Sequence, residues 1–231
     1  MLGRYGAHLA ATGWSVVGRV GENVEGQRYA LQDMAGRLVD AGRRLYERGW
    51  VPATSGNFSA RLDDGRIAIT VSGRHKGELV DDDIMLVDAD GDALDSSKRP
   101  SAETLLHVRL YRRFPDAAAV LHTHSVNDTL ISRTRGDHVA LDDYELLKAF
   151  RGVNTHDARI RVPIFDNDQD MVRLADRVDA YMDAHPELHA YLIAGHGLYT
   201  WGTSLEEALR HLEALEFLFE CEMRLQGAVM R

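Results

Sequence analysis

Hydrophobic and polar positions along the chain follow two periods. From Gln27 to Arg48 the apolar residues recur every three to four positions, which is the spacing of an amphipathic helix, and Gly49 is placed to end it. Short apolar runs then alternate with turn-forming residues. These runs predict strands at 58–62, 67–71 and 84–87, with Asp63-Asp64-Gly65 as the hairpin turn between the first two.

The second half of the chain mixes the two periods more closely. Ser101 is expected to cap a helix that contains Glu103 and ends near Phe114. The remaining pattern predicts strands at 117–121, 160–164, 190–194 and 198–201, and helices at 126–133, 170–184 and 204–225, with a further helix that begins at Asp142 and includes Glu145. We therefore expect an α/β fold in which one layered domain, residues 26–231, has a central mixed or mostly antiparallel sheet flanked by helices. Residues 1–25, which are glycine-rich and aperiodic, are expected to form an N-terminal arm.

Composition narrows the classes of partner. The formal net charge of -9 argues against nucleic acid or an anionic membrane as the main partner, although a locally positive pocket could still bind a small anionic substrate. The single cysteine, Cys221, excludes an intrachain disulfide. The sequence has neither an apolar run long enough to span a bilayer nor a clear signal-peptide pattern, so we expect a cytoplasmic protein.

Three histidines have the spacing of a metal site. His122 and His124 end an apolar run in Val120-Leu-His-Thr-His-Ser125, and residues i and i+2 of a strand point to the same side. His196, which lies between two glycines after another predicted strand, could complete the three-histidine face of a catalytic divalent metal site, with Glu103 as a candidate for the fourth position. The residues alone leave an alternative open, in which the histidines are unrelated and Glu103 is an ordinary acidic residue near a helix N-terminus.

Three turn segments could together bind an anion. They are Ser55-Gly56-Asn57, Ser72-Gly73 and Ser101, and turns of this kind expose backbone N–H groups that can cradle a phosphate. Lys76 or Arg74 would be the nearby cation. Three unrelated loops would use the same residue types, and without further support this simpler interpretation is preferred.

Five motifs together resemble those of the class II, zinc-dependent sugar-phosphate aldolases, a family that also includes epimerases and a dehydratase. In chain order they are Gly56-Asn57-x-Ser59-x-Arg61, Thr70-x-Ser72-Gly73, Pro100-Ser101-x-Glu103, His122-x-His124 and His196-Gly197. Each motif is weak alone, but five in order over roughly residues 28–225 are specific. The resemblance implies a class II aldolase-like fold and a homotetramer with active sites near subunit interfaces. It also implies one Zn²⁺ per subunit on His122, His124 and His196, and a substrate phosphate at Asn57, Ser72, Gly73, Ser101 and Lys76.

Four stretches are more narrowly similar to the dehydratase branch of this family. They are residues 48–57, 122–125, 145–148 and 195–202. This similarity implies a phosphorylated ketose substrate, 5-methylthioribulose 1-phosphate, which loses water to give 2,3-diketo-5-methylthiopentyl 1-phosphate in methionine salvage. It also implies that Glu145 is the catalytic acid/base. Glu103 occupies the position of the catalytic glutamate of the aldolases, so two carboxylates compete for proton transfer, and we prefer Glu145.

Two other functions stay open at this point. The same metal site could serve an aldolase or epimerase that acts on fuculose, rhamnulose or ribulose phosphates. Alternatively, the chain could be a binding module that resembles the adducin head domain and keeps only the fold. The presence of all three histidines and of Glu103 argues against this second alternative.

Overall fold

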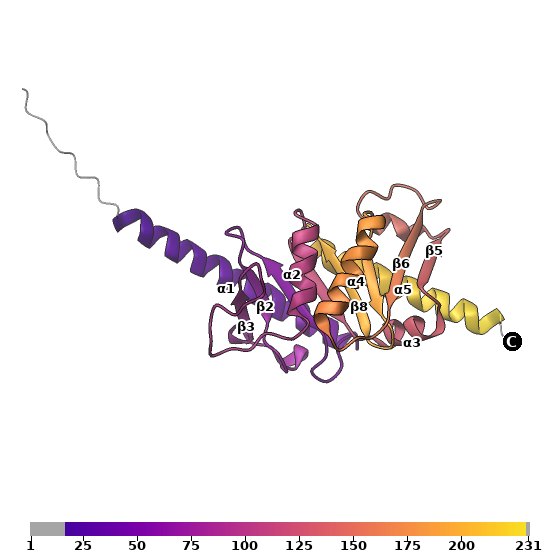
Figure 1. Ribbon diagram of the computed structural model, residues 1–231, viewed down its shortest axis with the longest axis horizontal. Helices are drawn as coiled ribbons and strands as arrows, with labels where there is room; N and C mark the ends of the chain where they lie inside the picture. The colour runs from indigo at the N-terminus through magenta and orange to yellow at the C-terminus, as the bar shows by residue number, and fades with distance from the viewer. Residues whose placement is uncertain (1–16, 230–231) are drawn as a thin grey trace, which may run out of the picture.

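The computed structural model describes residues 17–229 of the chain and places side chains for residues 27–227. Figure 1 shows the helices and strands along the chain. The helices are α1 (Val17–Glu47), α2 (Thr104–Arg113), α3 (Val126–Thr134), α4 (Met171–Ala184) and α5 (Leu205–Val229). The strands are β1 (Asn57–Arg61), β2 (Ile67–Thr70), β3 (Ile84–Val87), β4 (Ala119–Thr123), β5 (His138–Asp142), β6 (Arg159–Phe165), β7 (Ala190–Ile193) and β8 (Gly197–Gly202). Three short 3₁₀ turns are η1 (Lys76–Glu78), η2 (Asp81–Asp83) and η3 (Glu145–Ala149).

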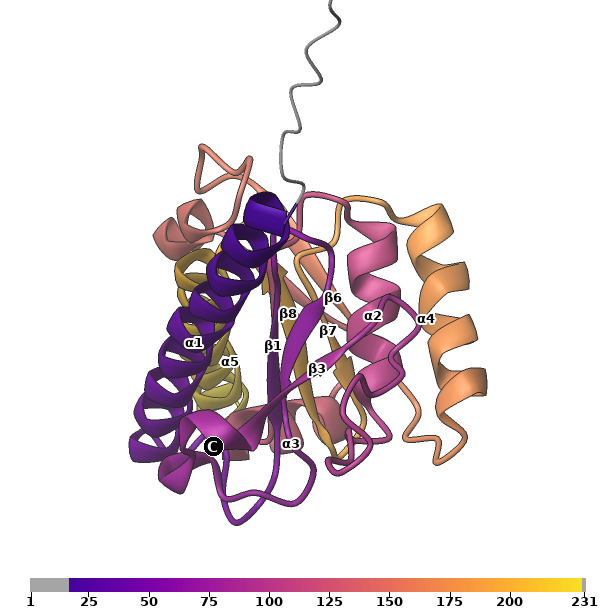
Figure 2. The ribbon, with the colours of Figure 1, turned by 90° about the vertical axis from the view of Figure 1, so that its left-hand side faces the viewer.

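The described strands form one mixed sheet in the order β3-β2-β1-β4-β8-β7-β6-β5. Each pair of neighbours is antiparallel except β6 and β7, which run parallel. Helices α1 and α5 cover one face of the sheet, and α2 and α4 cover the other (Figure 2). The predicted α/β layered domain with a mostly antiparallel sheet is therefore confirmed.

The sheet separates two hydrophobic cores because side chains alternate along each strand. In β4, Ala119 and Leu121 belong to the core under α1 and α5, whereas Val120 belongs to the core under α2 and α4. Strand β7 alternates in the same way, with Leu192 on the first side and Tyr191 on the second. Burial on both faces explains why these central strands are nearly continuous apolar runs in the sequence.

The first helix is longer than expected. It begins at Val17, so residues 17–25, which we assigned to an arm, are helical instead. Gly18 and Gly21 are poor helix formers and made this stretch look irregular, although Val17, Val20 and Val24 keep helical spacing. Residues 1–16 of the predicted arm lie outside the described residues, and the division into arm and domain stays a prediction. None of the described helices has both the length and the apolar character that crossing a bilayer requires.

Two further local predictions were wrong. Helix α2 begins at Thr104, so Glu103 occupies the N-cap position that we had given to Ser101. The Ser101 hydroxyl oxygen accepts a hydrogen bond from the backbone N–H of Glu103 at 3.2 Å, and the segment is a turn before the helix. The helix expected from Asp142 is absent, because Asp142 ends the edge strand β5 and Glu145 lies in the short turn η3.

Two glycines let neighbouring segments approach the end of β4. A Cβ atom at Gly197 would lie 2.0 Å from the backbone oxygen of Thr123 and 3.0 Å from a ring carbon of His122. Gly56 has φ +74°, and its Cβ would lie 2.7 Å from the backbone oxygen of His122. These short distances exclude a side chain at either position, so the backbone spacing around His122 depends on the two glycines.

We expect Gly197→Ala to lower the free energy of unfolding by about 1–3 kcal/mol, because the added methyl group must displace β4 or β8. Urea denaturation followed by circular dichroism measures this change. Gly36→Ala is the matched control: its Cβ would meet no heavy atom within 4 Å and it lies in helix α1, so its stability should be equal or higher by up to about 1 kcal/mol. Equal stability of Gly197→Ala and wild type would contradict the close approach of β8 to β4.

Candidate metal centre and anion pocket

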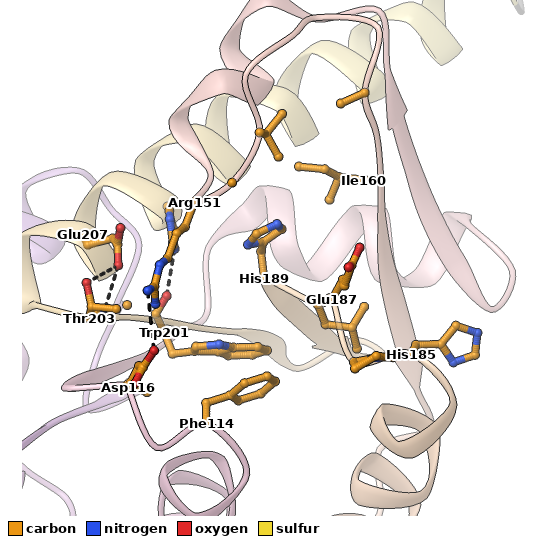
Figure 3. A pocket seen from close by; sticks show the side chains of 18 of the residues that line it. Phe114, Asp116, Arg151, Ile160, His185, Glu187, His189, Trp201, Thr203 and Glu207 are labelled. Atoms are coloured by element: carbon orange, nitrogen blue, oxygen red, sulfur yellow. Dashed lines mark hydrogen bonds and ion pairs between the residues drawn. The ribbon is translucent and has the colours of Figure 1, made fainter.

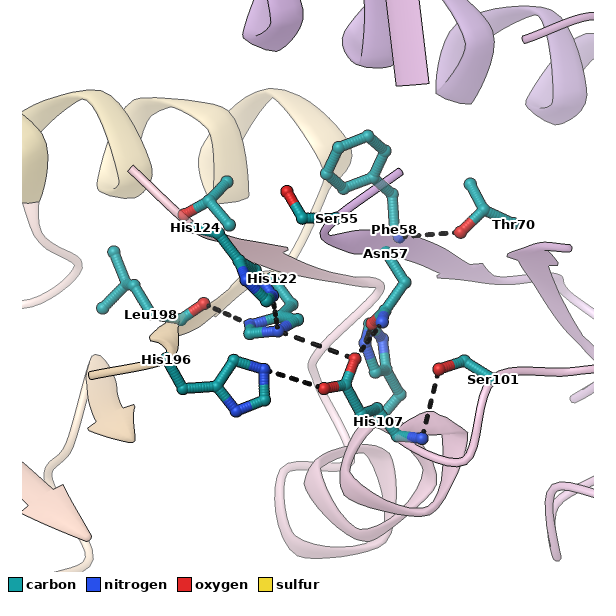
Figure 4. Close-up of polar contacts among 12 residues, drawn as sticks. Ser55, Asn57, Phe58, Thr70, Ser101, His107, His122, His124, His196 and Leu198 are labelled. Atoms are coloured by element: carbon teal, nitrogen blue, oxygen red, sulfur yellow. Dashed lines mark hydrogen bonds and ion pairs between the residues drawn. The ribbon is translucent and has the colours of Figure 1, made fainter. Parts of the chain in front are cut away.

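Four potential ligands meet at the end of the sheet where β4 ends and β8 begins (Figure 4). His122 lies in β4 and His124 just beyond it, His196 lies in the turn before β8, and Glu103 precedes α2. One ligand atom of each residue lies within 4.8 Å of the corresponding atoms of the other three. The structure therefore brings together the four residues that the sequence pattern selected.

The two histidines of the β4 segment approach each other through their Nε2 atoms. The Nδ1 of His122 donates to the backbone oxygen of Leu198 at 2.9 Å, so its Nε2 carries a lone pair. This Nε2 lies 2.8 Å from the Nε2 of His124. Burial lowers the pKa of His122 well below its ordinary value and that of His124 to about 4, so both rings are neutral near pH 7. Without a metal the two nitrogens can share one proton, and a divalent cation can replace it and accept both lone pairs.

Glu103 supplies a negative charge to the same cluster. Its carboxylate accepts a hydrogen bond from the Nε2 of His196 at 2.9 Å and from the amide nitrogen of Asn57 at 2.6 Å, and it lies 3.6 Å from the Nε2 of His122. Burial alone would raise the pKa of Glu103, but these donors and the neighbouring imidazoles hold it well below its ordinary value. An ionised carboxylate among three imidazoles is a donor set that fits a divalent metal.

A chain of buried hydrogen bonds orients this carboxylate. The Tyr111 hydroxyl lies 2.8 Å from the Ser59 oxygen, which lies 2.7 Å from the Nδ1 of His107. The Nε2 of His107 bonds to the side-chain oxygen of Asn57. Burial lowers the pKa of His107 to about 4, so the neutral ring can donate to Asn57 only if its Nδ1 accepts from Ser59. Because the Asn57 oxygen is then occupied, the amide nitrogen faces Glu103.

Lys76 is a buried cation beside the metal cluster. Its side chain is 2% exposed, and its ammonium group donates to the backbone oxygens of Thr54 and Arg74 at 3.0 and 2.7 Å. No carboxylate of residues 27–227 lies within ion-pair distance of it. Burial lowers the pKa of Lys76 to about 8. Burying a cation without a paired carboxylate costs folding free energy, and an anion bound in the adjoining space would neutralise the charge.

That space is a cavity of about 260 Å³. All five residues predicted to bind the phosphate line it, together with Glu103 and His124; the five are Asn57, Ser72, Gly73, Ser101 and Lys76. The Asn57 side chain is engaged with Glu103 and His107, so it acts on the carboxylate. Arg74, the alternative cation, is 60% exposed and pairs with Asp83 at 2.9 Å. Lys76 is therefore the better placed of the two, and the phosphate roles stay predictions.

A larger cavity lies elsewhere. It has a volume of about 910 Å³ and is lined by the stacked rings of Phe114 and Trp201, by His189 and by Arg151, which pairs with Asp116 (Figure 3). Its lining residues include none of the metal cluster or of the predicted phosphate residues. Pocket size alone would therefore have directed attention away from the residues that the sequence motifs select.

Glu145 is not part of the cluster within one chain. Strand β4 runs toward the metal cluster, and the pairings through β8, β7 and β6 make β5 run the opposite way. Glu145 follows β5, so it lies at the other end of the sheet. Its side chain is 76% exposed and pairs with Lys148 at 2.7 Å. The role predicted for Glu145 thus depends on a second copy of the chain.

Comparison with known proteins identifies the class of this site. Residues 36–223 match the model of the family described as class II aldolase and adducin N-terminal domain. A methylthioribulose-1-phosphate dehydratase of Methylococcus capsulatus is 63% identical over 197 residues, which is 85% of this chain and 96% of that protein. A protein of the same name from Pseudomonas paraeruginosa is 58% identical and covers 84% of this chain and 95% of its own length.

A solved structure has the same fold. The crystal structure of YgbL from Escherichia coli superposes with a TM-score of 0.73 at 27% identity, over 84% of this chain and 90% of that chain. The fold predicted from the motifs is therefore confirmed by a neighbour of low sequence identity.

We expect His124→Ala to weaken divalent metal binding by at least about 100-fold, because one of the neutral donors is lost. Titration of the metal-stripped protein with Co²⁺, followed by its visible absorption, measures the affinity. His156→Ala is the control, since His156 is exposed and pairs with Asp157 outside the cluster. Equal Co²⁺ affinity in the His124→Ala variant and wild type would remove His124 from the ligand set.

Proposed function

Because the chain belongs to the class II aldolase and adducin N-terminal domain family, we propose that it is a lyase that removes water from 5-methylthioribulose 1-phosphate. The product is 2,3-diketo-5-methylthiopentyl 1-phosphate, and the reaction is a step of methionine salvage. The observation that carries this proposal is the 58–63% identity, over nearly their full length, to proteins named for this dehydration. The assembled histidines and Glu103 favour an enzyme over a binding module.

We propose Zn²⁺, one ion per subunit, on His122, His124 and His196. The neutral imidazoles of His122 and His124, with the tautomer of His122 fixed by the Leu198 oxygen, support this assignment. A bound zinc ion would polarise the ketose carbonyl at C2 and make the hydrogen at C3 more acidic.

The dehydration needs a group that moves a proton. A carboxylate takes the proton from C3, the bond between C4 and its oxygen breaks, and that oxygen leaves as water after it receives a proton. The enol that remains tautomerises to the diketone. Glu103 is poorly suited to this role because its pKa lies well below the ordinary range, whereas an efficient general base has a pKa near the working pH. The contacts of Glu103 with His196 and Asn57 support it as a charge that completes the metal cluster. We retain Glu145 as the acid/base by its resemblance to the dehydratases, although its ion pair with Lys148 lowers its pKa as well.

Glu145 can act only if another copy of the chain brings it to the cluster. We therefore propose a homotetramer in which Glu145 from a neighbouring copy faces the metal centre. Its exposed position at the far end of the sheet leaves it accessible to such a contact. We also propose that the enzyme is cytoplasmic. Its net charge of -9 agrees with an enzyme whose substrate is a small molecule and not a nucleic acid or an anionic membrane.

We propose that the substrate phosphate binds in the 260 Å³ cavity, where Lys76 supplies the positive charge. Backbone N–H groups and hydroxyls of the turns around it would complete the phosphate contacts. This placement puts the carbon atoms next to the phosphate beside Glu103 and the histidines, which line or adjoin the same cavity.

Zinc-loaded wild type should convert 5-methylthioribulose 1-phosphate into a product lighter by one water, as measured by mass spectrometry. Glu145→Gln should reduce this rate by about 10²–10⁴-fold, because the amide cannot carry the proton. Glu187→Gln is the matched control, because it makes the same change at an exposed residue outside the cluster, and it should keep most of the rate. Smaller carbon fragments would indicate an aldolase, and an isomer of unchanged mass would indicate an epimerase.

A complementation experiment tests the contribution of a second copy. Glu145→Gln and His124→Ala should each be inactive alone. When the two variants are expressed together, mixed oligomers contain sites with intact histidines from one copy and intact Glu145 from another. Recovered activity supports the proposal, and no recovery in a confirmed mixed oligomer contradicts it.

The kcat/KM of wild type should fall as the pH rises above about 8. The pKa of Lys76 is lowered to about 8, so above this pH the free enzyme loses the ammonium charge that attracts the phosphate. Lys76→Met should lower kcat/KM at pH 7 by at least about 10-fold and remove this basic limb. A wild-type profile that is flat from pH 7 to 9.5 would contradict the role of Lys76.

A further inference from the structure

A second cavity opens on the other side of Glu103. It has a volume of about 740 Å³ and shares Ser72, Ser101 and Glu103 with the smaller cavity that contains Lys76. His124 lines the smaller cavity and His196 lines the larger one. The metal cluster therefore lies between the two cavities.

This arrangement gives a direction to a bound ketose phosphate. The smaller cavity holds the buried Lys76 ammonium group and fits the phosphate end. The carbon atoms that react must lie at the metal cluster, so the far end of the substrate continues into the larger cavity. If the proposed function is right, that far end is the methylthio group at C5, which is apolar and carries no charge.

The larger cavity offers apolar contacts for this group. Pro100, Ala102 and Met171 contribute to its lining, and Met171 is half-buried and also packs on the core under α2 and α4. A methionine side chain is flexible and polarisable, so it can adapt its shape to an apolar group such as a methylthio group. The polar members Arg99 and Gln169 are exposed.

Met171 stands on a rigid part of the molecule. It is the first residue of α4, and Asp170 caps the helix by accepting from the backbone N–H of Arg173 at 3.1 Å. The Arg173 guanidinium also holds Asp168 through two hydrogen bonds of 2.6 Å. The turn that carries His196 is tied to the same region, because the Ala194 N–H donates to the Phe165 oxygen at 2.8 Å. These hydrogen bonds therefore hold Met171, in the wall of the larger cavity, in a fixed position relative to His196.

We propose that Met171 determines specificity by contacting the methylthio group in the larger cavity and favouring it over a 5-hydroxyl group. This inference rests on the proposed dehydration and names the residue that selects the substrate. A contact with one or two apolar atoms in such a pocket changes kcat/KM by about 10–200-fold.

The test compares two substrates, 5-methylthioribulose 1-phosphate and ribulose 1-phosphate, which has a hydroxyl in place of the methylthio group. The readout is the ratio of the kcat/KM for the methylthio substrate to that for ribulose 1-phosphate. If ribulose 1-phosphate is not dehydrated, its inhibition constant is measured and compared in place of its kcat/KM. Met171→Gln keeps the length of the side chain but makes it polar, and this ratio should fall by about 10-fold or more. Met171→Leu keeps an apolar wall and should stay within about 3-fold of wild type.

Val172→Gln controls for a polar residue at the start of α4. Val172 is 57% exposed and does not line the cavity, so its ratio should equal that of wild type. An unchanged ratio in Met171→Gln, with wild type still dehydrating the methylthio substrate, overturns the role of Met171 alone. A wild type that removes water from neither compound overturns the proposed function and this inference together. A fall of both kcat/KM values by the same factor, with normal zinc content, also contradicts a selective contact.

Discussion

The arrangement of the site depends on one contact, the approach of two imidazole nitrogens to 2.8 Å at the end of β4. Two neutral nitrogens at this distance need a positive species between them, either a proton or a metal ion. The Leu198 oxygen fixes which nitrogen of His122 takes part, and burial keeps both rings neutral. Backbone segments could reach this spacing only where Gly56 and Gly197 replace side chains. The ends of strands β4 and β8, the two glycines and the histidines thus together bring the two nitrogens close enough to share a cation.

Patterns that are local in sequence allowed much of this to be predicted. Alternating apolar runs gave the mixed sheet, and the i, i+2 spacing of His122 and His124 gave the metal face, because a strand keeps such residues on one side. Lys76 and the small turns do line one cavity, while their phosphate role stays a prediction. The Ser101 cap and the helix at Asp142 failed because turn and edge-strand geometry is decided by neighbours that are distant in the sequence. The helix at residues 17–25 was missed because two glycines, which disfavour helices, outweighed the helical spacing of three valines.

The hydrogen-bond chain behind Glu103 could not be inferred in the same way. Ser59 meets His107 and Tyr111 across 48 and 52 residues, so no window of sequence contains the contact. One local signal was present, since His107 and Tyr111 are four residues apart on one face of α2. Asn57 shows the consequence: its place in a phosphate motif suggested a ligand for the substrate, but its amide is occupied by Glu103 and His107. One N–H of this amide goes to Glu103, and the phosphate role of Asn57 stays a prediction for the other.

The two halves of the site have opposite electrostatic requirements. The histidines and Glu103 need a cation, whereas Lys76 needs an anion, and both sets are largely buried, which costs folding free energy. Glu103 adjoins both the histidines and Lys76, and its negative charge offsets part of the charge of Lys76. A doubly charged phosphate beside Lys76 and a divalent metal among the histidines would satisfy both sets at once. An apolar group such as methylthio adds no charge to this balance, so its recognition must come from packing, and Met171 lies on the side of Glu103 away from Lys76. Charge can thus set the direction in which the substrate binds, while contact with the wall of the larger cavity decides which substrate fits.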